Sequence, residues 1–183
     1  MKRWALVQGG KAAGKSTAAR RVAERLEARG VPVAGFFQEA IEEDGDRIGY
    51  RLRRIGRNDA VVIAKRGAEP RSPSEEAFCS FVFDNGAFEA ARAWLSEDAP
   101  RARVIVLDEI SKLEVAGKGH HDAVLAALAR DAITVLAVRA DQLFYVMERF
   151  GLEEPVAGLE ASPDADDTEF VEAIARAATG DGT

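Results

Sequence analysis

A glycine-rich segment near the start of the chain has the residue types and the spacing to hold phosphate groups. It matches the pattern G-x-x-x-x-G-K-[ST] with Gly9, Gly10, Lys11, Ala12, Ala13, Gly14, Lys15 and Ser16. Glycines let the backbone turn tightly and bring its N–H groups to phosphate oxygens, and a following helix points its positive end at the same place. In such a loop the lysine contacts the β- and γ-phosphates and the hydroxyl binds Mg²⁺. We therefore expect residues 9–17, with Thr17 at the helix start, to bind a nucleoside triphosphate (NTP).

Two adjacent carboxylates, Asp108 and Glu109, follow the apolar run 104–107. The run predicts a strand buried on both faces, and the carboxyl end of a parallel strand faces the ligand crevice of an α/β sheet. Asp108 is the candidate to hold Mg²⁺ together with Ser16, because this ion keeps several waters and needs few protein ligands. Glu109 is the candidate to orient and polarise an attacking water, and it forms the predicted catalytic set with Lys15 and one further lysine.

That further lysine is Lys112, and two other cations lie near the same predicted site. Lys112 could contact the γ-phosphate, or it could be solvated or paired with Glu114. Arg139 follows the apolar run 133–138 and could sense phosphate or face solvent. Lys11 lies inside the phosphate loop and could reach the γ-phosphate or point outward. The sequence leaves these alternatives open.

Alternating apolar segments predict the elements that must position these residues. Strands are expected at 4–8, 31–37, 104–107 and 133–138, and helices at 16–29, 87–95, 119–130 and 141–150. Between them we expect a hairpin-rich excursion at 38–65, a polar loop at 66–77, a short strand at 81–83 and an acidic linker at 151–165. A terminal helix is expected at 166–178. In the helix at 119–130 the periodicity turns Val124, Leu125 and Leu128 inward, and Cys79 is interpreted as a small apolar filler.

Strands that alternate with helices favour an α/β fold with a mainly parallel sheet covered by helices. The length of 183 residues suits one domain, and no repeat or long linker divides it. We therefore expect a single domain over residues 1–183, with the excursion at 38–65 as a β-hairpin insertion.

Charge and composition exclude several other classes of protein. The net charge is −6, but residues 47–71 carry eight basic and two acidic side chains, so the remaining chain carries −12. An acidic protein is a poor general nucleic-acid binder, and the arginines at 47, 51 and 53 are best interpreted as one solvated strand face. No apolar run is long enough to span a membrane, and one cysteine permits no internal disulfide. We expect a cytoplasmic protein with no membrane and no nucleic-acid partner; no pattern indicates an oligomeric state.

Several motifs together resemble a known family, the small P-loop nucleoside-triphosphatases described as thermophilic or cancer-related. The resemblance spans about residues 4–150 and rests on the phosphate loop and on the segments 35–39, 45–50 and 108–114. It implies a RecA-like three-layer core and slow, broad NTP hydrolysis that depends on Mg²⁺. By position it implicates Lys15, Ser16, Asp108 and Glu109, with Glu114 and Lys112 nearby.

The sequence departs from the family pattern at a few positions. Ser111 stands where a glycine is usual, Gln38 where a threonine is common, and Arg139 lacks a preceding histidine. The phosphate loop also lacks the usual proline-glycine pair. These departures bear on substrate range and turnover more than on nucleotide binding.

The function expected from the sequence is Mg²⁺-dependent hydrolysis of ATP, GTP or another NTP to the diphosphate and phosphate. Two alternatives remain: a small-molecule kinase that uses the basic segment 47–71 or the loop 66–83 as a lid, and a nucleotide-dependent switch or accessory protein. Glu109 beside Asp108 favours water as the acceptor.

Overall fold

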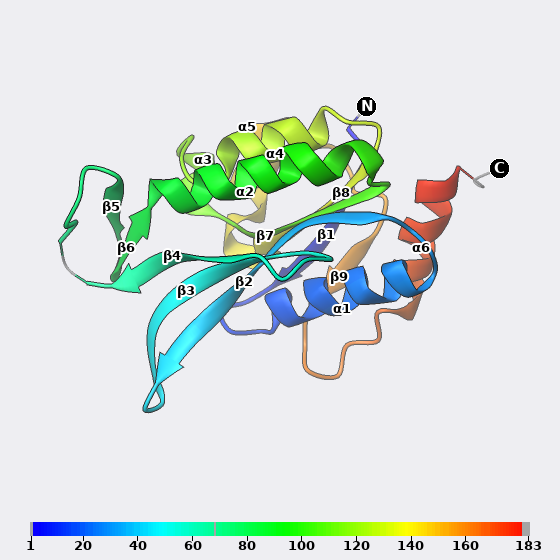
Figure 1. Ribbon diagram of the computed structural model, residues 1–183. Coiled ribbons are helices and arrows are strands. Elements are labelled where there is room, and N and C mark those ends of the chain that lie inside the picture. The colour runs from blue at the N-terminus through cyan, green and yellow to red at the C-terminus, as the bar shows by residue number, and fades with distance from the viewer. Residues whose placement is uncertain (1, 68, 181–183) are drawn as a thin grey trace.

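The computed structural model describes residues 2–67 and 69–180, so Met1, Ala68 and residues 181–183, which belong to the expected domain, lie outside it. Within the described residues, nine strands form one sheet in the order β5-β6-β4-β3-β2-β7-β8-β1-β9 (Figure 1). The strands are β1 (Trp4–Gly9), β2 (Val33–Glu43), β3 (Asp46–Arg54), β4 (Ala60–Arg66), β5 (Glu75–Phe78), β6 (Phe81–Asp84), β7 (Val104–Ile110), β8 (Ile133–Arg139) and β9 (Gly158–Glu160).

The sheet has a parallel half and an antiparallel half. Strands β2, β7, β8, β1 and β9 pair in parallel, and β3, β4, β6 and β5 extend the sheet beyond β2 as antiparallel strands. The parallel half confirms the expected α/β class. Because parallel strands share their carboxyl edge, the segments that leave β1, β7 and β8 gather at one end of the sheet.

Helices cover both faces of the parallel half (Figure 1). One face carries α1 (Lys15–Ala28) and α6 (Thr168–Thr179), and the other carries α2 (Asn85–Asp98), α4 (His121–Leu128) and α5 (Leu143–Phe150), with the short α3 (Lys112–Val115). Single 3₁₀ turns at Ala99–Arg101 and Ala140–Gln142 join two of these elements to their neighbours. No helix among the described residues is long and apolar enough to cross a bilayer.

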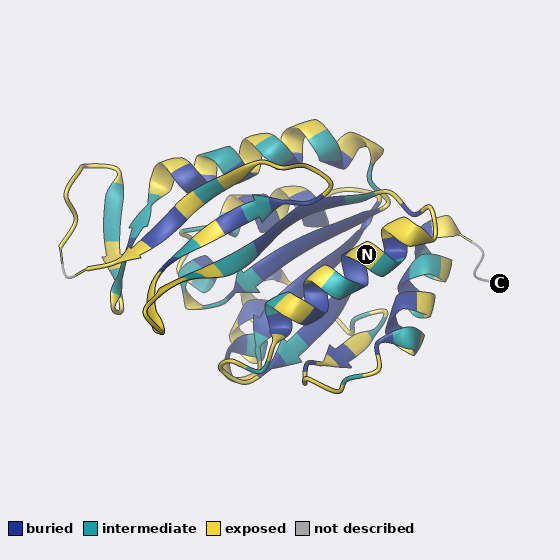
Figure 2. Ribbon diagram, turned by 60° about the horizontal axis from the view of Figure 1, so that its bottom comes forward, coloured by how far each residue is buried: buried dark blue, intermediate teal, exposed yellow. Residues whose placement is uncertain are grey.

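Alternation along the buried strands supplies a separate core to each helical layer. In β1, Trp4 and Leu6 pack toward α2, α4 and α5, whereas Ala5 and Val7 pack toward α1 and α6. Successive side chains of a strand point to opposite faces, so one short strand contributes to both cores. Figure 2 shows this burial as continuous dark strands at the centre of the sheet.

One glycine is required by the close approach of two parallel strands. Gly35 pairs with Val106 across β2 and β7, and its φ is 124°. A Cβ atom at this position would lie 1.9 Å from the carbonyl oxygen of Val106. Only glycine fits here, because it adopts this φ and has no side chain to clash.

Several boundaries differ from those expected from the sequence. The strand expected to end at 37 continues to Glu43, so the excursion at 38–65 begins as an extension of a core strand and not as a separate insertion. The expected loop at 66–77 contains the start of β5, and the expected linker at 151–165 contains β9, which pairs with β1. Both strands are short and carry acidic residues, so they lack the apolar run that identified the others.

Two side chains expected inside the protein are exposed. Leu125 lies on the solvent side of α4 with 44% of its surface accessible, because the helix turns Ala123, Val124 and Ala127 to the sheet instead. Cys79 is exposed with a φ of 56° in the tight β5–β6 turn, so it fills no core space.

Candidate active site

The phosphate loop wraps into a tight turn that leaves the start of α1 open. Ala12 and Gly14 both have positive φ, at 59° and 87°, and Gly14 is the residue that precedes the helix. No side chain caps this end of α1, so its first N–H groups have no side-chain partner. Free N–H groups and the positive end of the helix dipole together form an anion site.

Lys15 lies inside this loop and not on its surface. Only 5% of the residue is accessible, and its ammonium group donates a 2.9 Å hydrogen bond to the carbonyl oxygen of Gly10. The contact places the cation within the loop, beside the N–H groups of the anion site.

Asp108 is fully buried where β7 reaches the crevice. Its carboxylate accepts hydrogen bonds of 2.9 Å from the N–H groups of Gln38 and Glu109, and the Ser16 hydroxyl lies within hydrogen-bonding reach. Burial, assisted by repulsion from Glu109, raises the pKa of Asp108 to about 7. A nearby cation would favour the charged carboxylate and so offset the cost of this burial.

A bulge in β7 turns the next carboxylate in the opposite direction. The pairing with β8 shifts register between Leu107 and Ile110, and Glu109 has a φ of 58°. Bulges next to active sites redirect a side chain, and a non-glycine residue in this conformation is strained. Asp108 therefore stays buried beside Ser16, while Glu109 lines the open cavity.

A third acidic residue, Glu114, holds the segment after the bulge in place. Glu114 is buried and accepts hydrogen bonds from the N–H groups of Ser111, at 2.9 Å, and His120, at 3.0 Å. Ser111 and Glu114 form a capping box at the start of α3. Burial raises the pKa of Glu114 to about 7. The pairing with Lys112 considered from the sequence is wrong, because both Glu114 oxygens serve backbone donors and Lys112 is exposed at the cavity.

These residues surround one cavity of about 560 Å³. It brings together most of the predicted site residues: Lys11, Ala12, Gly14, Lys15, Ser16, Thr17, Glu109 and Lys112, with Arg139 at the end of β8. Gly9, Gly10 and Ala13 belong to the loop but do not line the cavity, and Asp108 lies just behind its wall. Arg139 is partly buried and bonds to Asp141, with 2.7 Å between the Arg139 Nε and an Asp141 carboxylate oxygen.

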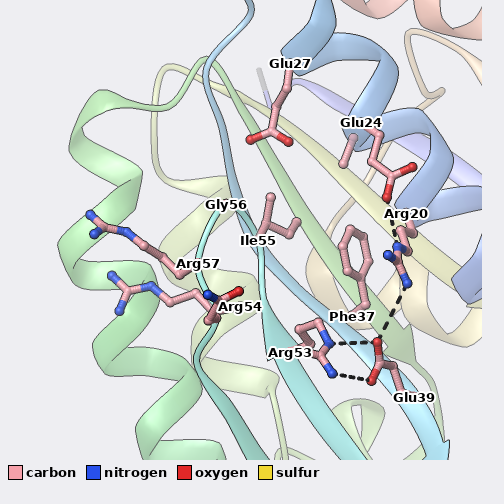
Figure 3. A pocket seen from close by; sticks show the side chains of 12 residues that line it. Arg20, Glu24, Glu27, Phe37, Glu39, Arg53, Arg54, Ile55, Gly56 and Arg57 are labelled. Atoms are coloured by element: carbon pink, nitrogen blue, oxygen red, sulfur yellow. Dashed lines mark hydrogen bonds and ion pairs between the residues drawn. The ribbon is translucent and has the colours of Figure 1, made fainter.

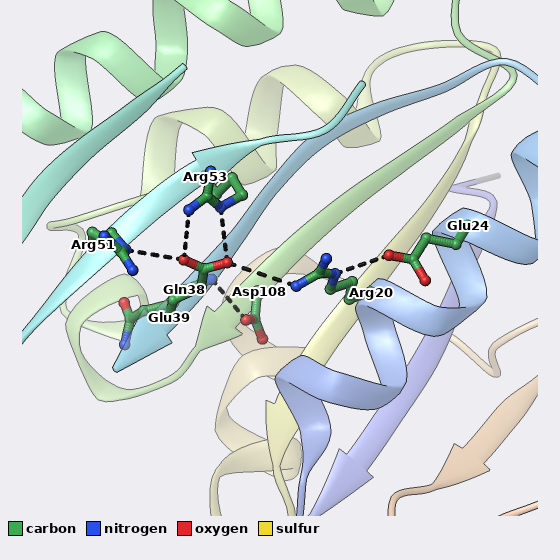
Figure 4. Close-up of polar contacts among 7 residues, drawn as sticks. All are labelled: Arg20, Glu24, Gln38, Glu39, Arg51, Arg53 and Asp108. Carbon is green, nitrogen blue, oxygen red and sulfur yellow. Dashed lines mark hydrogen bonds and ion pairs between the residues drawn. The ribbon is translucent and has the colours of Figure 1, made fainter. Parts of the chain in front are cut away.

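One carboxylate of the cavity lining, that of Glu39, holds basic side chains from α1 and β3. Glu39 accepts hydrogen bonds from Arg53, at 2.8 Å, and Arg51, at 3.0 Å, and its oxygen lies 3.8 Å from Arg20 of α1 (Figure 4). The hydrogen bond from Arg53 is the main cause that lowers the pKa of Glu39. The arginine face interpreted as solvated from the sequence is thus half-exposed and ion-paired, and of that face only Arg47 reaches the cavity.

A second hollow lies on the other side of this ion-pair wall. It measures about 610 Å³ and lies between α1 and the turn after β3 (Figure 3). Three residues of the ion-pair wall also line this hollow: Arg20, Glu39 and Arg53. No residue of the phosphate loop contributes to it, so we place the phosphate chemistry in the smaller cavity.

Sequence reasoning missed three groups that shape this region. Gln38 acts through its backbone N–H, which has no sequence signal. Glu39 holds arginines that are 12 and 14 residues away. Arg54 is buried in ion pairs with Asp98 at 2.7 Å and Glu97 at 2.6 Å, which join β3 to α2. The only sequence signal for these ion pairs was that charged residues recur at every second position in part of the predicted hairpin.

The comparison with protein families decides the relationship. The model of a family described as NTPase matches residues 5–171, which is most of the chain. The chain belongs to this NTPase family. The match runs from β1 into α6 and includes both the phosphate loop and the bulge in β7.

Individual relatives agree with the family assignment. The chain is similar to the nucleoside-triphosphatase THEP1 of Thermofilum pendens, with 33% identity over 128 residues that cover 69% of this chain and 68% of that protein. It is 29% identical over 142 residues to the human cancer-related nucleoside-triphosphatase, with 74% of each chain covered.

Solved structures of NTPase-family proteins share the fold. A solution structure of a human cancer-related nucleoside triphosphatase superposes with a TM-score of 0.69 and 22% identity, covering 99% of this chain and 100% of that one. The crystal structure of THEP1 from Aquifex aeolicus gives the same TM-score with 21% identity, over 92% and 95% of the two chains. The expected P-loop NTPase fold is confirmed.

Proposed function

We propose that this NTPase-family protein hydrolyses nucleoside triphosphates to diphosphate and phosphate in a reaction that requires Mg²⁺. One observation carries the proposal: the bulge in β7 turns Glu109 into the cavity with Lys15 and leaves Asp108 buried beside Ser16. A phosphoryl site, metal ligands and a base are thereby supplied from two neighbouring segments, the phosphate loop with the start of α1 and the end of β7.

The oxygen atoms near the loop fit Mg²⁺. Ser16 and Asp108 would hold the ion, because a hydroxyl and one carboxylate are what it takes from a protein when phosphates and waters complete its shell. The described residues contain no group of three or more His, Cys, Asp or Glu that could enclose a metal. The ion would neutralise charge on the β- and γ-phosphates.

The protein's own groups supply the remaining steps. Lys15 exchanges the Gly10 carbonyl for the β- and γ-phosphate oxygens, and the N–H groups of the loop and of the first turn of α1 orient the triphosphate. Glu109 accepts a hydrogen bond from the attacking water and takes its proton as the bond from the water oxygen to the γ-phosphorus forms. The bond between that phosphorus and the oxygen that bridges it to the β-phosphate breaks, and the diphosphate leaves with this oxygen. Backbone N–H groups and Lys15 act without moving far, since the loop already holds them in place.

Two further cations of the cavity lining are assigned to the γ-phosphate. Lys112 follows the bulge and is exposed in the cavity, and Arg139 lies at the end of the neighbouring strand β8. We assign Lys112 to the γ-phosphate oxygens. Arg139, held by Asp141, is assigned to sense whether the γ-phosphate is present.

We keep the sequence-based proposal of a cytoplasmic protein, supported by a single exposed cysteine.

Phosphate release without any added acceptor tests the proposal. Purified protein is mixed with ATP, GTP, CTP or UTP, with Mg²⁺ or with EDTA, and phosphate is measured over time. We expect steady release with Mg²⁺ and background release with EDTA. Tight NTP binding without release would contradict hydrolysis and favour the switch alternative. Diphosphate that forms only with an added hydroxyl compound, with the phosphoryl group on that compound and no free phosphate, would favour the kinase alternative.

A further inference from the structure

The cavity extends beyond Glu109 into a part whose walls are aromatic. We call this part the aromatic chamber, and its side chains come from β3, β5, β6, α2 and the turn before α4: Tyr50, Phe78, Phe81, Phe83, Phe88 and His120. Ring centroids lie 5.0 Å apart for Tyr50 and Phe81 and 6.1 Å apart for the stacked Phe83 and Phe88. Triphosphate and Mg²⁺ are polar and give these rings no partner.

The order of the strands separates the aromatic chamber from the nucleoside. The phosphate loop follows β1, Glu109 ends β7, and the chamber lies beyond β7 over the antiparallel half of the sheet. Under the proposed function, on which this step rests, the γ-phosphate faces Glu109. The base and ribose, at the other end of the triphosphate, then leave the loop on the side away from the chamber. The chamber is therefore free for a second molecule.

His120 forms the inner wall of the chamber and carries unused polar atoms. Its ring lies 4.4 Å from Phe36 and 4.7 Å from Phe88, between centroids, and 3% of the residue is accessible. Neither ring nitrogen has a hydrogen-bond partner among the described residues. Burial lowers the pKa of His120 to about 3, so the ring is neutral, with one donor and one acceptor. An unpaired buried polar group destabilises the folded protein, and a phenylalanine here would avoid that cost.

One cation beside the chamber favours an anionic ligand. Lys15, Lys112 and Arg139 are assigned to the phosphates of the NTP, whereas Arg47 lines the same cavity and has no role there. Arg47 lies over the Tyr50 ring, with 5.5 Å from its guanidinium carbon to the ring centroid, and so places a cation beside the chamber wall. A ring would stack on the aromatic walls while its anionic group meets this cation.

We propose that the aromatic chamber is a second ligand site, which binds a planar aromatic or heteroaromatic anion at the same time as the NTP. The ligand lies across Glu109 from the phosphate loop, where the attacking water enters. Its presence therefore slows phosphate release without displacing the nucleotide.

The test uses 1-anilinonaphthalene-8-sulfonate, an aromatic anion whose fluorescence rises in apolar surroundings. We expect saturable binding to the full chain, both alone and with a non-hydrolysable NTP analogue and Mg²⁺ present. Saturating probe should slow phosphate release severalfold while nucleotide affinity is unchanged. Displacement of the probe by the NTP analogue would overturn the proposal, because one ligand would then fill both parts of the cavity.

Two variants test where the probe binds, and a third variant is the matched control. Phe81→Ser removes a half-buried wall, and Ala40→Trp fills the mouth from an exposed position opposite Tyr50 in the β2–β3 pairing without removing a core contact. Each should weaken probe binding at least tenfold. Phe144→Ser removes the most exposed large apolar side chain of the described residues, 71% accessible on α5, and should leave binding unchanged.

The outcomes separate this proposal from the hydrolysis proposal. Lys15→Ala should keep the probe site and lose the nucleotide. Probe binding that survives both Phe81→Ser and Ala40→Trp, or that is lost in Phe144→Ser, would overturn the second site and leave hydrolysis untouched. Failure of phosphate release with intact probe binding would overturn hydrolysis alone.

Discussion

The lysine of the phosphate loop is held inside the loop by a backbone contact. Lys15 is buried, and its ammonium group is held by the Gly10 carbonyl at 2.9 Å. The backbone around it is strained, since Ala12 adopts a positive φ in a loop that usually has glycine at such turns. The fold of the loop therefore positions this cation beside the N–H groups of the anion site.

Replacing this lysine should abolish tight nucleotide binding and leave the fold intact. Lys15→Ala removes the only buried cation of the loop, and its aliphatic part contributes to neither core cluster. We expect at least a 100-fold loss of affinity for a fluorescent NTP analogue, measured by titration, with an unchanged circular dichroism spectrum. Lys11→Ala, which removes an exposed charge from the same loop, is the control and should have a far smaller effect. Unchanged affinity of Lys15→Ala for the NTP analogue would contradict the assignment of the phosphate loop.

The candidate site could be predicted from the sequence only where its residues are contiguous. The loop pattern and the pair Asp108-Glu109 were visible because their spacing is fixed along the chain. The bulge that sends the two carboxylates in opposite directions was not, since it arises from the register between β7 and β8. Glu39 and His120 were missed for the same reason: their contacts join segments far apart in the sequence.

At the scale of single elements, the segment from the bulge to α4 depends on Glu114. The carboxyl group joins Ser111 to His120 and so closes the turn that carries Lys112. Gly119 makes room for it, because a Cβ atom there would lie 2.5 Å from a Glu114 oxygen. A buried acid in this role makes the stability of the segment depend on pH.

Ionisation of Glu114 should make the protein less stable as the pH rises from about 4.5 to about 7. The folded pKa is raised to about 7 from the ordinary value of 4.5, so this stabilisation is full below pH 4.5 and lost by pH 7. The loss is up to about 3 kcal/mol. Glu114→Gln has no ionisable group at this position. In urea unfolding, the free energy of unfolding of the wild type should therefore fall relative to that of the variant as the pH rises over this range. Glu172→Gln, an exposed glutamate on α6, is the control. A gap that does not change with pH would refute this role.

Element prediction from the sequence succeeded for periodic segments and failed for short polar ones. The helix at α1 and the strands β1, β7 and β8 were found because their apolar runs are long or regular. Strand β9 was read as a linker because its sequence, Gly-Leu-Glu, has one apolar residue, and its position is set by pairing with β1. The apolar periodicity predicted Leu125 on the buried face of α4, but Ala123 and Ala127 occupy that face and Leu125 is exposed.

At the scale of the whole molecule, the basic segment 47–71 is embedded in an acidic protein. The chain has a net charge of −6, and the arginines of β3 are mostly engaged by internal acids, including Glu39, Asp98 and Glu97. Ion-paired guanidinium groups on an acidic surface offer little to a polyanion. The segment therefore serves the sheet and the cavity wall.

We expect no saturable binding of nucleic acid. Fluorescence anisotropy with labelled single- and double-stranded DNA and RNA at near-physiological salt is the measurement. The double variant Arg51→Ala/Arg53→Ala releases Glu39 and should alter NTP turnover while polymer binding stays absent. Micromolar or tighter binding that this variant loses would overturn the expectation.

The global arrangement was predicted for one half of the sheet and not for the other. The parallel half follows from alternating strands and helices, which admit few topologies. The antiparallel half, β3 to β6, was predicted as a hairpin-rich excursion at 38–65 and a separate short strand at 81–83, and its aromatic side chains were not expected to meet. They come together only because β2 continues past the core and carries the extra strands with it (Figure 1).

The central claim is that Glu109 activates water for attack on the γ-phosphate, and Glu109→Gln tests it most directly. The amide keeps the size of the side chain but is a poor base, and a positioned general base contributes roughly 10²–10⁴-fold. Nucleotide affinity and single-turnover phosphate release would be measured with Mg²⁺ for wild type, Glu109→Gln and Glu148→Gln, an exposed glutamate on α5. The account predicts unchanged affinity in all three and a rate reduced at least 100-fold in Glu109→Gln alone. Release at the wild-type rate in Glu109→Gln would contradict it.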